Sequence, residues 1–275
     1  MKIKFRKMHG AGNDFILVDD RAGSFPAADR RWIRHICSSH DGIGAEGLIL
    51  LQTSEEASFC MRFFNPDGSE AGMCGNGARC AARAACDLGI ARKTMTIQTE
   101  AGILKATVVK KGAQVAMPPA SGIRLNFPVR AGRRAVICSF VNTGVPHVVV
   151  ETKNIENVDL ERWGPLLRRH RDFAPHGANI DFMQITGKRS LRVRTYERGV
   201  EAETPACGTG ITACAVVAAL NNKVKPPVRV ICRHGDALQV DFRRSGEDME
   251  GITLSGPAEF VFHGEISYPG RRNSK

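Results

Sequence analysis

The amino-acid sequence predicts an α+β protein of two pseudo-symmetric halves, each a curled, mostly antiparallel sheet around a central helix. Segments that alternate apolar and polar residues dominate the chain, and helical segments are few. Two stretches also echo each other, Met73-Cys74-Gly75-Asn76-Gly77-Ala78-Arg79 and Ala206-Cys207-Gly208-Thr209-Gly210-Ile211-Thr212. Their cysteines are 133 residues apart (207 − 74), about half of the 275-residue chain, which indicates two related halves.

The first half is predicted to cover residues 1–118, with 264–275 as a candidate segment to complete it. Alternating residues predict strands at 3–8, 15–18, 59–64, 95–99, 104–109 and 115–117. Helices are expected at about 29–39 and directly after Cys74. The stretch Pro118-Pro119-Ala120-Ser121-Gly122 is the clearest linker signal in the chain.

The second half is predicted to cover residues 119–263. Strands are expected at 136–141, 148–150, 180–185, 191–196, 228–231, 238–242 and 260–262. Helices are expected at about 160–170 and directly after Cys207. Each half therefore has one helix that begins at a cysteine and continues as a run of small residues.

Composition narrows the class of protein. A hydrophobic content of 43% suits a folded core, and the chain has no apolar run near the roughly 18 residues that cross a bilayer. The N-terminal residues alternate like a strand and lack the apolar stretch of a secretory signal, so we expect a cytoplasmic protein.

The nine cysteines are an odd number without a disulfide framework, and no Cys-x-x-Cys pair supports a metal site. Those outside the two turns are predicted to be small buried apolar residues. They are Cys37, Cys60, Cys80, Cys86, Cys138, Cys214 and Cys232.

The net charge of +11 raises the question of nucleic-acid binding. The basic clusters are short and widely spaced, and only two Trp and two Tyr are available to stack on bases. We therefore favour a solvated, Arg-rich surface that attracts anionic metabolites, and expect neither a nucleic-acid nor a membrane partner.

The two cysteine turns carry the chemistry. A helix N-terminus favours a thiolate, and its exposed N–H groups can hold a carboxylate. Two opposed sulfurs suit inversion at an acidic carbon, because one removes the α-proton while the other donates a proton from the opposite face. The alternative is that each turn only packs its cysteine, but two copies at half-chain spacing argue against it.

Two further segments allow both a structural and a functional interpretation. His147 begins an apolar strand, where a hydrogen-bonded structural histidine is common, and Glu197-Arg198 could form a surface ion pair at a strand end. The segment from Lys7 to Phe15 interrupts a strand pattern with two glycines and polar side chains, as a binding loop would. It lacks the third glycine and following helix of a dinucleotide fingerprint.

Taken together, six ordered motifs resemble the diaminopimelate epimerase family from Lys7 to about Phe262. Besides the two cysteine turns, the second preceded by Glu203-Thr204-Pro205, they are Met8-His9-Gly10-Ala11-Gly12-Asn13-Asp14-Phe15, Gly42-Ile43-Gly44-Ala45-Glu46-Gly47, Phe64-Asn65-Pro66-Asp67-Gly68-Ser69-Glu70 and Tyr196-Glu197-Arg198-Gly199.

The resemblance implies a cofactor-independent enzyme that interconverts LL- and meso-diaminopimelate on the way to lysine and peptidoglycan. It also implies two α+β domains with the site in the cleft between them, and a homodimer. The implied acid and base are Cys74 and Cys207, with His147 and Glu197 close to the reacting centre.

The resemblance further implies how substrate is held. The amides of Gly75, Asn76, Gly208 and Thr209 would bind the α-carboxylate. The distal amino-acid end would meet Asn13, Asn65, Asn179 and Arg198, with the guanidinium of Arg198 on the far carboxylate.

The sequence departs from the family pattern at two positions. Val145 stands where many members carry asparagine, and Glu46 where aspartate is usual. Val145 keeps a second hypothesis open, a racemase of the same fold that acts on another amino acid. A third hypothesis, from another class, is a basic binding protein with structural cysteines.

Overall fold

The computed structural model describes residues 1–132, 134–233, 235–246 and 248–270. The chain divides into two compact units. Unit 1 comprises Met1–Val115 together with residues 256–270, and unit 2 comprises Ala116–Ser255. The described residues form a mixed α+β fold, mostly strands, with four α-helices and two short 3₁₀ helices.

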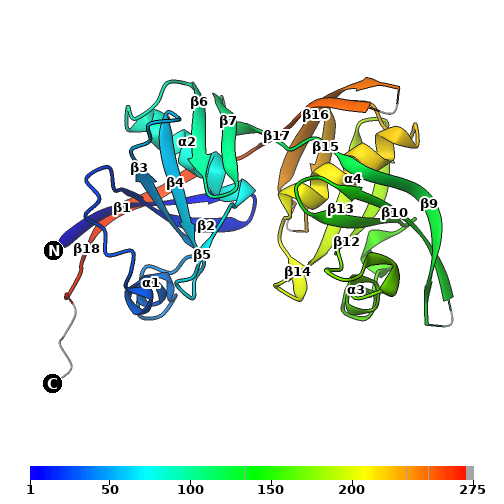
Figure 1. Cartoon of the computed structure of the whole chain (residues 1–275), viewed down its shortest axis with the longest axis horizontal. Coiled ribbons are helices and arrows are strands. Elements are labelled where there is room, and N and C mark those ends of the chain that lie inside the picture. The colour runs from blue at the N-terminus through cyan, green and yellow to red at the C-terminus, as the bar shows by residue number, and fades with distance from the viewer. Residues whose placement is uncertain (133, 234, 247, 271–275) are drawn as a thin grey trace. The chain divides into compact units, whose positions relative to one another are not determined.

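Unit 1 is built from strands that surround one helix and carry a second on their outside (Figure 1). In chain order its elements are β1 (Lys2–Gly10), β2 (Asn13–Asp19), α1 (Arg30–Cys37), β3 (Leu48–Gln52), β4 (Phe59–Phe64), β5 (Glu70–Ala71), α2 (Gly75–Asp87), β6 (Thr94–Thr99), β7 (Gly102–Val109), β8 (Gly112–Ala116) and β18 (Glu259–Ser267).

The strand pairings of unit 1 are mostly antiparallel. Strand β1 lies between β18 and β2 and is antiparallel to both. Strand β2 is parallel to β3, β3 is antiparallel to β4, and β4 is antiparallel to β5 but parallel to β6. Strands β6, β7 and β8 continue as an antiparallel series. The two parallel pairs span α1 and α2, because a parallel connection needs a crossover.

Unit 2 contains the remaining elements. They are β9 (Ser121–Ala131), β10 (Arg134–Asn142), β11 (Pro146–Glu151), η1 (Ile155–Asn157), α3 (Leu160–Arg168), η2 (Arg171–Phe173), β12 (Asn179–Gly187), β13 (Ser190–Glu197), β14 (Ala202–Thr204), α4 (Gly208–Leu220), β15 (Val228–Ile231), β16 (Ala237–Ser245) and β17 (Asp248–Gly256).

The pairings of unit 2 follow the same order as those of unit 1. Strand β10 is antiparallel to β9 and β11, β11 is parallel to β12, and β12 is antiparallel to β13. Strand β13 is antiparallel to β14 and parallel to β15, and β15 to β17 run antiparallel. Strands β3 and β4 of unit 1 therefore correspond to β12 and β13, and α2 corresponds to α4.

Helices α2 and α4 lie among the strands of their own units (Figure 1). Helix α2 contacts β1, β2, β3, β4, β6 and β7, and α4 contacts β10 to β13, β15 and β16. Strands can approach a helix from so many sides because its side chains are small, and the alanines of both helices are almost fully buried. Each of these helices holds the cysteine that precedes it at a fixed place in the unit.

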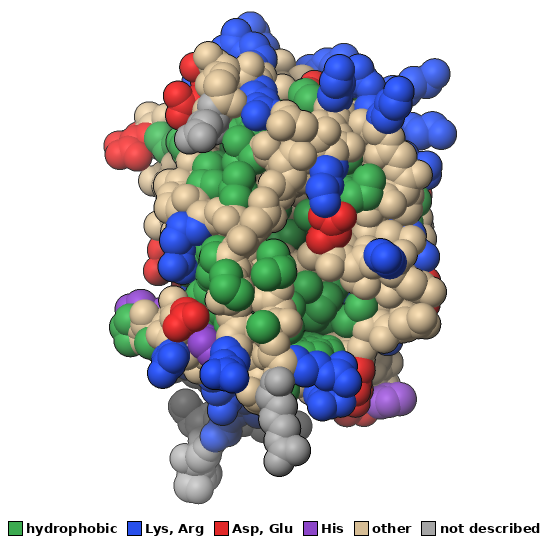
Figure 2. All heavy atoms as spheres, turned by 90° about the vertical axis from the view of Figure 1, so that its right-hand side faces the viewer, with side chains coloured by type: hydrophobic (Ala, Val, Ile, Leu, Met, Phe, Trp, Pro, Cys, Tyr) green, Lys and Arg blue, Asp and Glu red, His purple; other side chains and the backbone are tan. Residues whose placement is uncertain are grey.

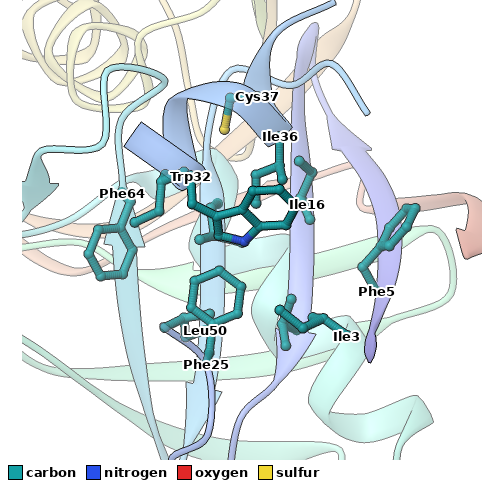
Figure 3. Close-up of a cluster of buried hydrophobic side chains, with 12 residues drawn as sticks. Ile3, Phe5, Ile16, Phe25, Trp32, Ile36, Cys37, Leu50 and Phe64 are labelled. Atoms are coloured by element: carbon teal, nitrogen blue, oxygen red, sulfur yellow. The ribbon is translucent and has the colours of Figure 1, made fainter. Parts of the chain in front are cut away.

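A second helix covers the outer face of part of each sheet. Figure 3 shows Trp32 and Ile36 of α1 in one cluster with Ile16, Leu50 and Phe64, which come from β2, β3 and β4, and all five are buried. In unit 2, α3 packs in the same way through Leu160 and Leu167 against β11 and β12. Burial of one large apolar side chain contributes about 1.5–3 kcal/mol, so these clusters stabilise the sheets that carry the site.

The structure confirms the four predicted helices and places a strand at each predicted strand segment. It adds β3, β5, β9, β14 and β17, which the sequence analysis missed. The predicted linker Pro118–Gly122 was too long, because β9 begins at Ser121 and pairs with β10.

None of the nine cysteines, all of which lie in the described residues, forms a disulfide. The prediction of burial for the seven outside the turns is confirmed for five of them, whereas Cys60 and Cys86 are only half-buried. Burial raises the pKa of the Cys37 thiol to about 11 and of Cys80 and Cys138 to about 12, so these thiols are protonated near neutrality. No helix in the described part of the chain is both long and apolar enough to span a membrane.

Candidate active site

Cys74 lies directly before α2, after the short strand β5. It has an extended backbone (φ −135°, ψ 116°) and is the N-cap residue of the helix. Its Sγ accepts a hydrogen bond from the N–H of Gly77 at 3.4 Å. A sulfur that accepts from a helix N-terminus is in a setting that favours the thiolate.

Cys207 occupies the same place before α4, with an extended backbone (φ −105°, ψ 108°). It is more buried than Cys74, with an exposed fraction of 7%. Its Sγ lies 3.3 Å from the hydroxyl oxygen of Thr209. Burial raises the pKa of the Cys207 thiol, and the negative charges of Glu197 and Asp181 raise it further.

The third residue after each cysteine is a glycine because the helix start lies close to a strand. A Cβ at Gly77 would meet the side chain of Ile49 on β3 at 3.0 Å. A Cβ at Gly210 would lie only 2.2 Å from the carboxylate of Asp181 on β12. The first glycine of the first turn differs, since a Cβ at Gly75 would meet nothing within 4 Å, which leaves room beside its amide.

His147 and Asp181 form a fully buried pair beneath α4. His147 Nδ1 lies 2.6 Å from Asp181 Oδ2, and neither side chain is exposed. His147 Nε2 lies 2.9 Å from the hydroxyl of Thr209, which in turn contacts Cys207. The other carboxylate oxygen of Asp181 accepts from the Thr195 hydroxyl at 2.7 Å. His147 therefore reaches the sulfur through Thr209.

Glu197 ends β13 in the same unit. Burial raises the pKa of its carboxyl, while the neighbouring Thr204 hydroxyl and His147 lower it. Since Glu197 also acts on the pKa of Cys207, the structure places this carboxyl, His147 and Cys207 in one electrostatic neighbourhood.

A polar cluster of a different kind supports the Cys74 turn. The amide of Asn76 donates to the Oδ1 of Asn13, and Asn13 donates to the carboxylate of Glu46. Asn76 Oδ1 accepts from the guanidinium of Arg79 at 2.8 Å. Arg79 is fully buried and also donates to the carbonyl oxygen of Pro257 at 3.4 Å.

The remaining predicted site residues lie in both units. Asn65 is at the turn between β4 and β5, where its Nδ2 donates to the hydroxyl of Ser69 at 3.0 Å. Asn179 begins β12, is 3% exposed, and its Oδ1 accepts from the backbone N–H of Arg198 at 2.7 Å. Arg198 is half-buried, and its Nη1 donates a long bond of 3.5 Å to the carbonyl oxygen of His176.

Within unit 1 the structure therefore brings together Asn13, Asn76 and the Cys74 turn, and within unit 2 it brings together His147, Asn179, Glu197, Thr209 and Cys207. The sequence analysis missed Arg79, Asp181 and Thr195. Arg79 had one signal, an arginine inside a small-residue helix. Asp181 had another, an acidic residue within the apolar strand β12.

The described residues contain no group of three or more His, Cys, Asp or Glu side chains that could hold a metal ion. Part of the basic surface is paired with acidic side chains. Arginines form ion pairs with acidic side chains in both units, such as Arg62 with Glu70 at 2.7 Å and Arg194 with Glu203 at 2.8 Å. In Figure 2, Lys and Arg side chains lie at several margins of the face shown, with uncharged and apolar surface between them.

Solved structures of similar fold define the class of protein. A phenazine biosynthesis protein of the PhzF family from Bacillus anthracis matches with a TM-score of 0.74 at 18% identity, over 98% of this chain and all of that one. A hydroxyproline epimerase from Agrobacterium vitis matches with a TM-score of 0.69 at 17% identity, over 96% of this chain and 92% of that one. The chain thus has the mixed α+β fold of these proteins.

Sequence relatives narrow the class to a family. The family model of diaminopimelate epimerase matches residues 5–123 and 139–261. The diaminopimelate epimerase of Aquifex aeolicus (strain VF5) is 41% identical over 278 residues, which cover 96% of this chain and 98% of that protein. That of Chlorobaculum tepidum is 40% identical, over 94% of this chain and all of that protein. The chain belongs to the diaminopimelate epimerase family.

Proposed function

We propose that this protein is an isomerase that interconverts LL- and meso-diaminopimelate by proton transfer between two sulfurs, without a cofactor. The observation that carries the proposal is the pair of cysteines that begin α2 and α4 at corresponding places in the two units. Family membership gives the substrate class, an amino acid.

In this mechanism one cysteine, as a thiolate, removes the α-proton while the other, as a thiol, protonates the opposite face. The reverse direction exchanges their roles. The intermediate carbanion needs its charge stabilised on the carboxylate oxygens, and preorganised N–H donors supply that stabilisation. The donors in this proposal are the amides of Gly75, Asn76, Gly208 and Thr209.

For both sulfurs to reach one carbon, the two units must close around the substrate as pseudo-symmetric halves, with the reacting carbon in the cleft between them. The matching order of strand pairings supports this arrangement. The 133-residue spacing of the cysteines supports it as well. His147 and Glu197 would then tune proton transfer at the Cys207 side.

The distal end of diaminopimelate is a second amino-acid group. In the proposal Asn13, Asn65, Asn179 and Arg198 hold it, with Arg198 on the carboxylate. Val145 is half-buried, has no polar side chain, and precedes Pro146, whose carbonyl oxygen accepts from Asn179 Nδ2 at 3.3 Å. This observation favours a second candidate, a racemase for a smaller amino acid, which would not need the distal contacts.

The test of the function is proton exchange with solvent. Purified protein incubated with LL-diaminopimelate in heavy water under reducing conditions should form the meso isomer, with deuterium at one α-carbon. Single amino acids such as proline, hydroxyproline and alanine serve as competing substrates. Exchange into one of them but not into diaminopimelate would favour the second candidate, and exchange into none would contradict both.

We further propose that the protein is a cytoplasmic homodimer. On β18 the consecutive side chains Phe260, Val261 and Phe262 are 48%, 52% and 43% exposed. Exposed large apolar side chains on a strand of this kind are typical of association sites. Light scattering should give twice the chain mass of 29.9 kDa, and V261E should shift the mass toward that of one chain. A mass of one chain for the unmodified protein would contradict the dimer.

A further inference from the structure

Asp181 is a buried carboxylate to which the proposed mechanism gives no role. It lies in the middle of β12, fully buried, and accepts from His147 on one oxygen and from Thr195 on the other. A buried carboxylate is costly unless it is fully hydrogen-bonded, so its presence needs a reason.

The corresponding place in unit 1 shows that the fold does not require an acid here. Asp181 pairs with Thr195 across β12 and β13, as Ile49 pairs with Phe63 across β3 and β4. Ile49 and Asp181 both lie beneath a glycine of the helix start, Gly77 and Gly210 respectively. Apolar side chains therefore fill this place in one unit, while a polar network fills it in the other.

The hydrogen bonds of Asn179 determine which nitrogen of His147 carries the hydrogen. The backbone N–H of Arg198 can only donate, so the side-chain atom of Asn179 that it contacts at 2.7 Å is the oxygen. The amide nitrogen of Asn179 consequently faces His147 Nε2, at 3.5 Å, and the carbonyl oxygen of Pro146, at 3.3 Å. Nε2 therefore faces a donor and acts as the acceptor.

The carboxylate of Asp181 enforces the same arrangement from the other side of the ring. A carboxylate only accepts, so Nδ1 at 2.6 Å must carry the hydrogen. Thr195 donates to the second oxygen of Asp181 and keeps the carboxylate in place. His147 is thus held as the Nδ1–H tautomer by two independent contacts.

The tautomer gives the chain of hydrogen bonds to the sulfur a single direction. Because Nε2 accepts, the hydroxyl of Thr209 donates to it, and the hydroxyl oxygen is left to accept from the Cys207 thiol at 3.3 Å. In this chain of hydrogen bonds the Cys207 thiol donates to the Thr209 oxygen, and the Thr209 hydroxyl donates to His147 Nε2. His147 Nδ1–H donates to the Asp181 carboxylate.

We propose that Asp181 is a positioning residue that fixes the tautomer of His147 and thereby gives Cys207 a proton path through Thr209. When Cys207 must become a thiolate, its proton moves to the Thr209 oxygen while the Thr209 hydroxyl proton moves to Nε2. The products are a thiolate and an imidazolium paired with the Asp181 carboxylate, so no proton is lost. This inference rests on the proposed function for the use of the path, but the tautomer does not depend on it.

The first test needs no substrate. A long-range ¹H–¹⁵N spectrum of the full-length protein, with the His147 signals assigned by H147Q, should show protonated Nδ1 and unprotonated Nε2. D181N offers an amide in place of the carboxylate and should populate the Nε2–H form. An Nε2–H form in the unmodified protein, or an unchanged tautomer in folded D181N, would overturn the proposal.

The second test measures turnover. D181N should reduce kcat about 10²–10⁴-fold and leave KM within about threefold, since a wrong histidine tautomer disables proton transfer rather than binding. The matched control is D20N in unit 1, where a carboxylate 2% exposed accepts from Phe25 N–H and Gln52. D20N should keep activity within about threefold, because its acid lies outside the path. Equal losses in D181N and D20N would indicate a structural role only.

Thr209 allows a check that does not depend on the folding of D181N. T209V preserves the branched shape but removes the hydroxyl, and should lower kcat about 10–10²-fold, while T209S should restore it to within about threefold. Full activity in T209V would contradict the path. Failure of the unmodified protein to turn over diaminopimelate while the tautomer is as stated would contradict the function and leave the role of Asp181 in place.

Discussion

The Cys74 turn and the Cys207 turn have the same backbone plan but are supported by groups of opposite charge. The residue between the two glycines is Asn76 in one turn and Thr209 in the other. Asn76 accepts from the buried guanidinium of Arg79, whereas Thr209 is linked through His147 to the buried carboxylate of Asp181. Asn76 is also linked through Asn13 to Glu46, but that carboxylate is exposed. The buried charge near this position is therefore a cation in one turn and an anion in the other.

The sulfurs differ in the same sense. Cys74 Sγ accepts from the N–H of Gly77, and Cys207 Sγ lies 3.3 Å from the Thr209 hydroxyl, which can accept from a thiol. A bond from the Gly210 N–H lowers the pKa of Cys207, but by less than burial raises it. Burial, Glu197 and Asp181 together raise the pKa of Cys207. Two copies of one motif can therefore give their cysteines different electrostatic surroundings through the residues that lie beneath them.

The largest expected effect comes from removing either sulfur. C74A and C207A should each lower epimerisation in both directions by about 10³-fold or more, because each direction needs an acid and a base. Chiral chromatography of the product, with either the LL or the meso isomer as the starting substrate, measures the rate in each direction. Turnover by one variant in one direction only would show that the two turns are not the complementary pair described here.

A smaller effect is expected from the buried cation of unit 1. R79M keeps an unbranched side chain but leaves Asn76 Oδ1 without its donor, so we expect a loss of about 2 kcal/mol in the free energy of unfolding. Activity should fall about 10-fold as the turn loosens. R79K restores a cation without the planar geometry and should recover part of both losses. If R79M matches the unmodified protein in urea unfolding and in turnover, the opposite charges have no functional meaning.

The smallest expected effect concerns thiol reactivity without substrate. Iodoacetamide at pH 8 should alkylate Cys74 about 10-fold faster than Cys207, since Cys74 is half-buried and the pKa of Cys207 is raised. Because a raised pKa lowers the thiolate fraction at a given pH, the rate at Cys207 should increase steeply up to high pH. E197Q removes one negative charge, lowers that pKa and should speed the reaction. Peptide mapping by mass spectrometry separates the two sites, and faster alkylation of Cys207 would reverse the comparison.

The sequence was sufficient to predict the strands that bury only one face, because their residues alternate between apolar and polar. It was also sufficient to predict the helices that have a clear start signal. Strand β3 was missed because Leu48–Leu51 is apolar on both faces and shows no alternation. Strand β9 was missed because it contains Pro128, has mostly exposed residues and follows the predicted linker.

The placement of both cysteines directly before a helix could be predicted from the motifs, because a glycine-rich turn followed by small residues sets the helix start locally. The buried carboxylate of Asp181 could not be predicted from the sequence. In β12 the order Ile180, Asp181, Phe182 has the alternation of a strand with one solvated face, yet all three are buried because one face packs on α3 and the other on α4. That arrangement depends on contacts between segments far apart in the chain.

The enclosure of α2 and α4 by strands has a consequence for how the enzyme can change over evolution. The buried alanine side chains of α2 and α4 pack closely against the surrounding strands, so a larger residue at one of these positions would displace the helix. The cysteine sulfur at the N-terminus of that helix would move with the helix. Substitutions that adapt the enzyme to new substrates are therefore expected in the surrounding loops. Helices α2 and α4, which hold the two sulfurs, keep their positions.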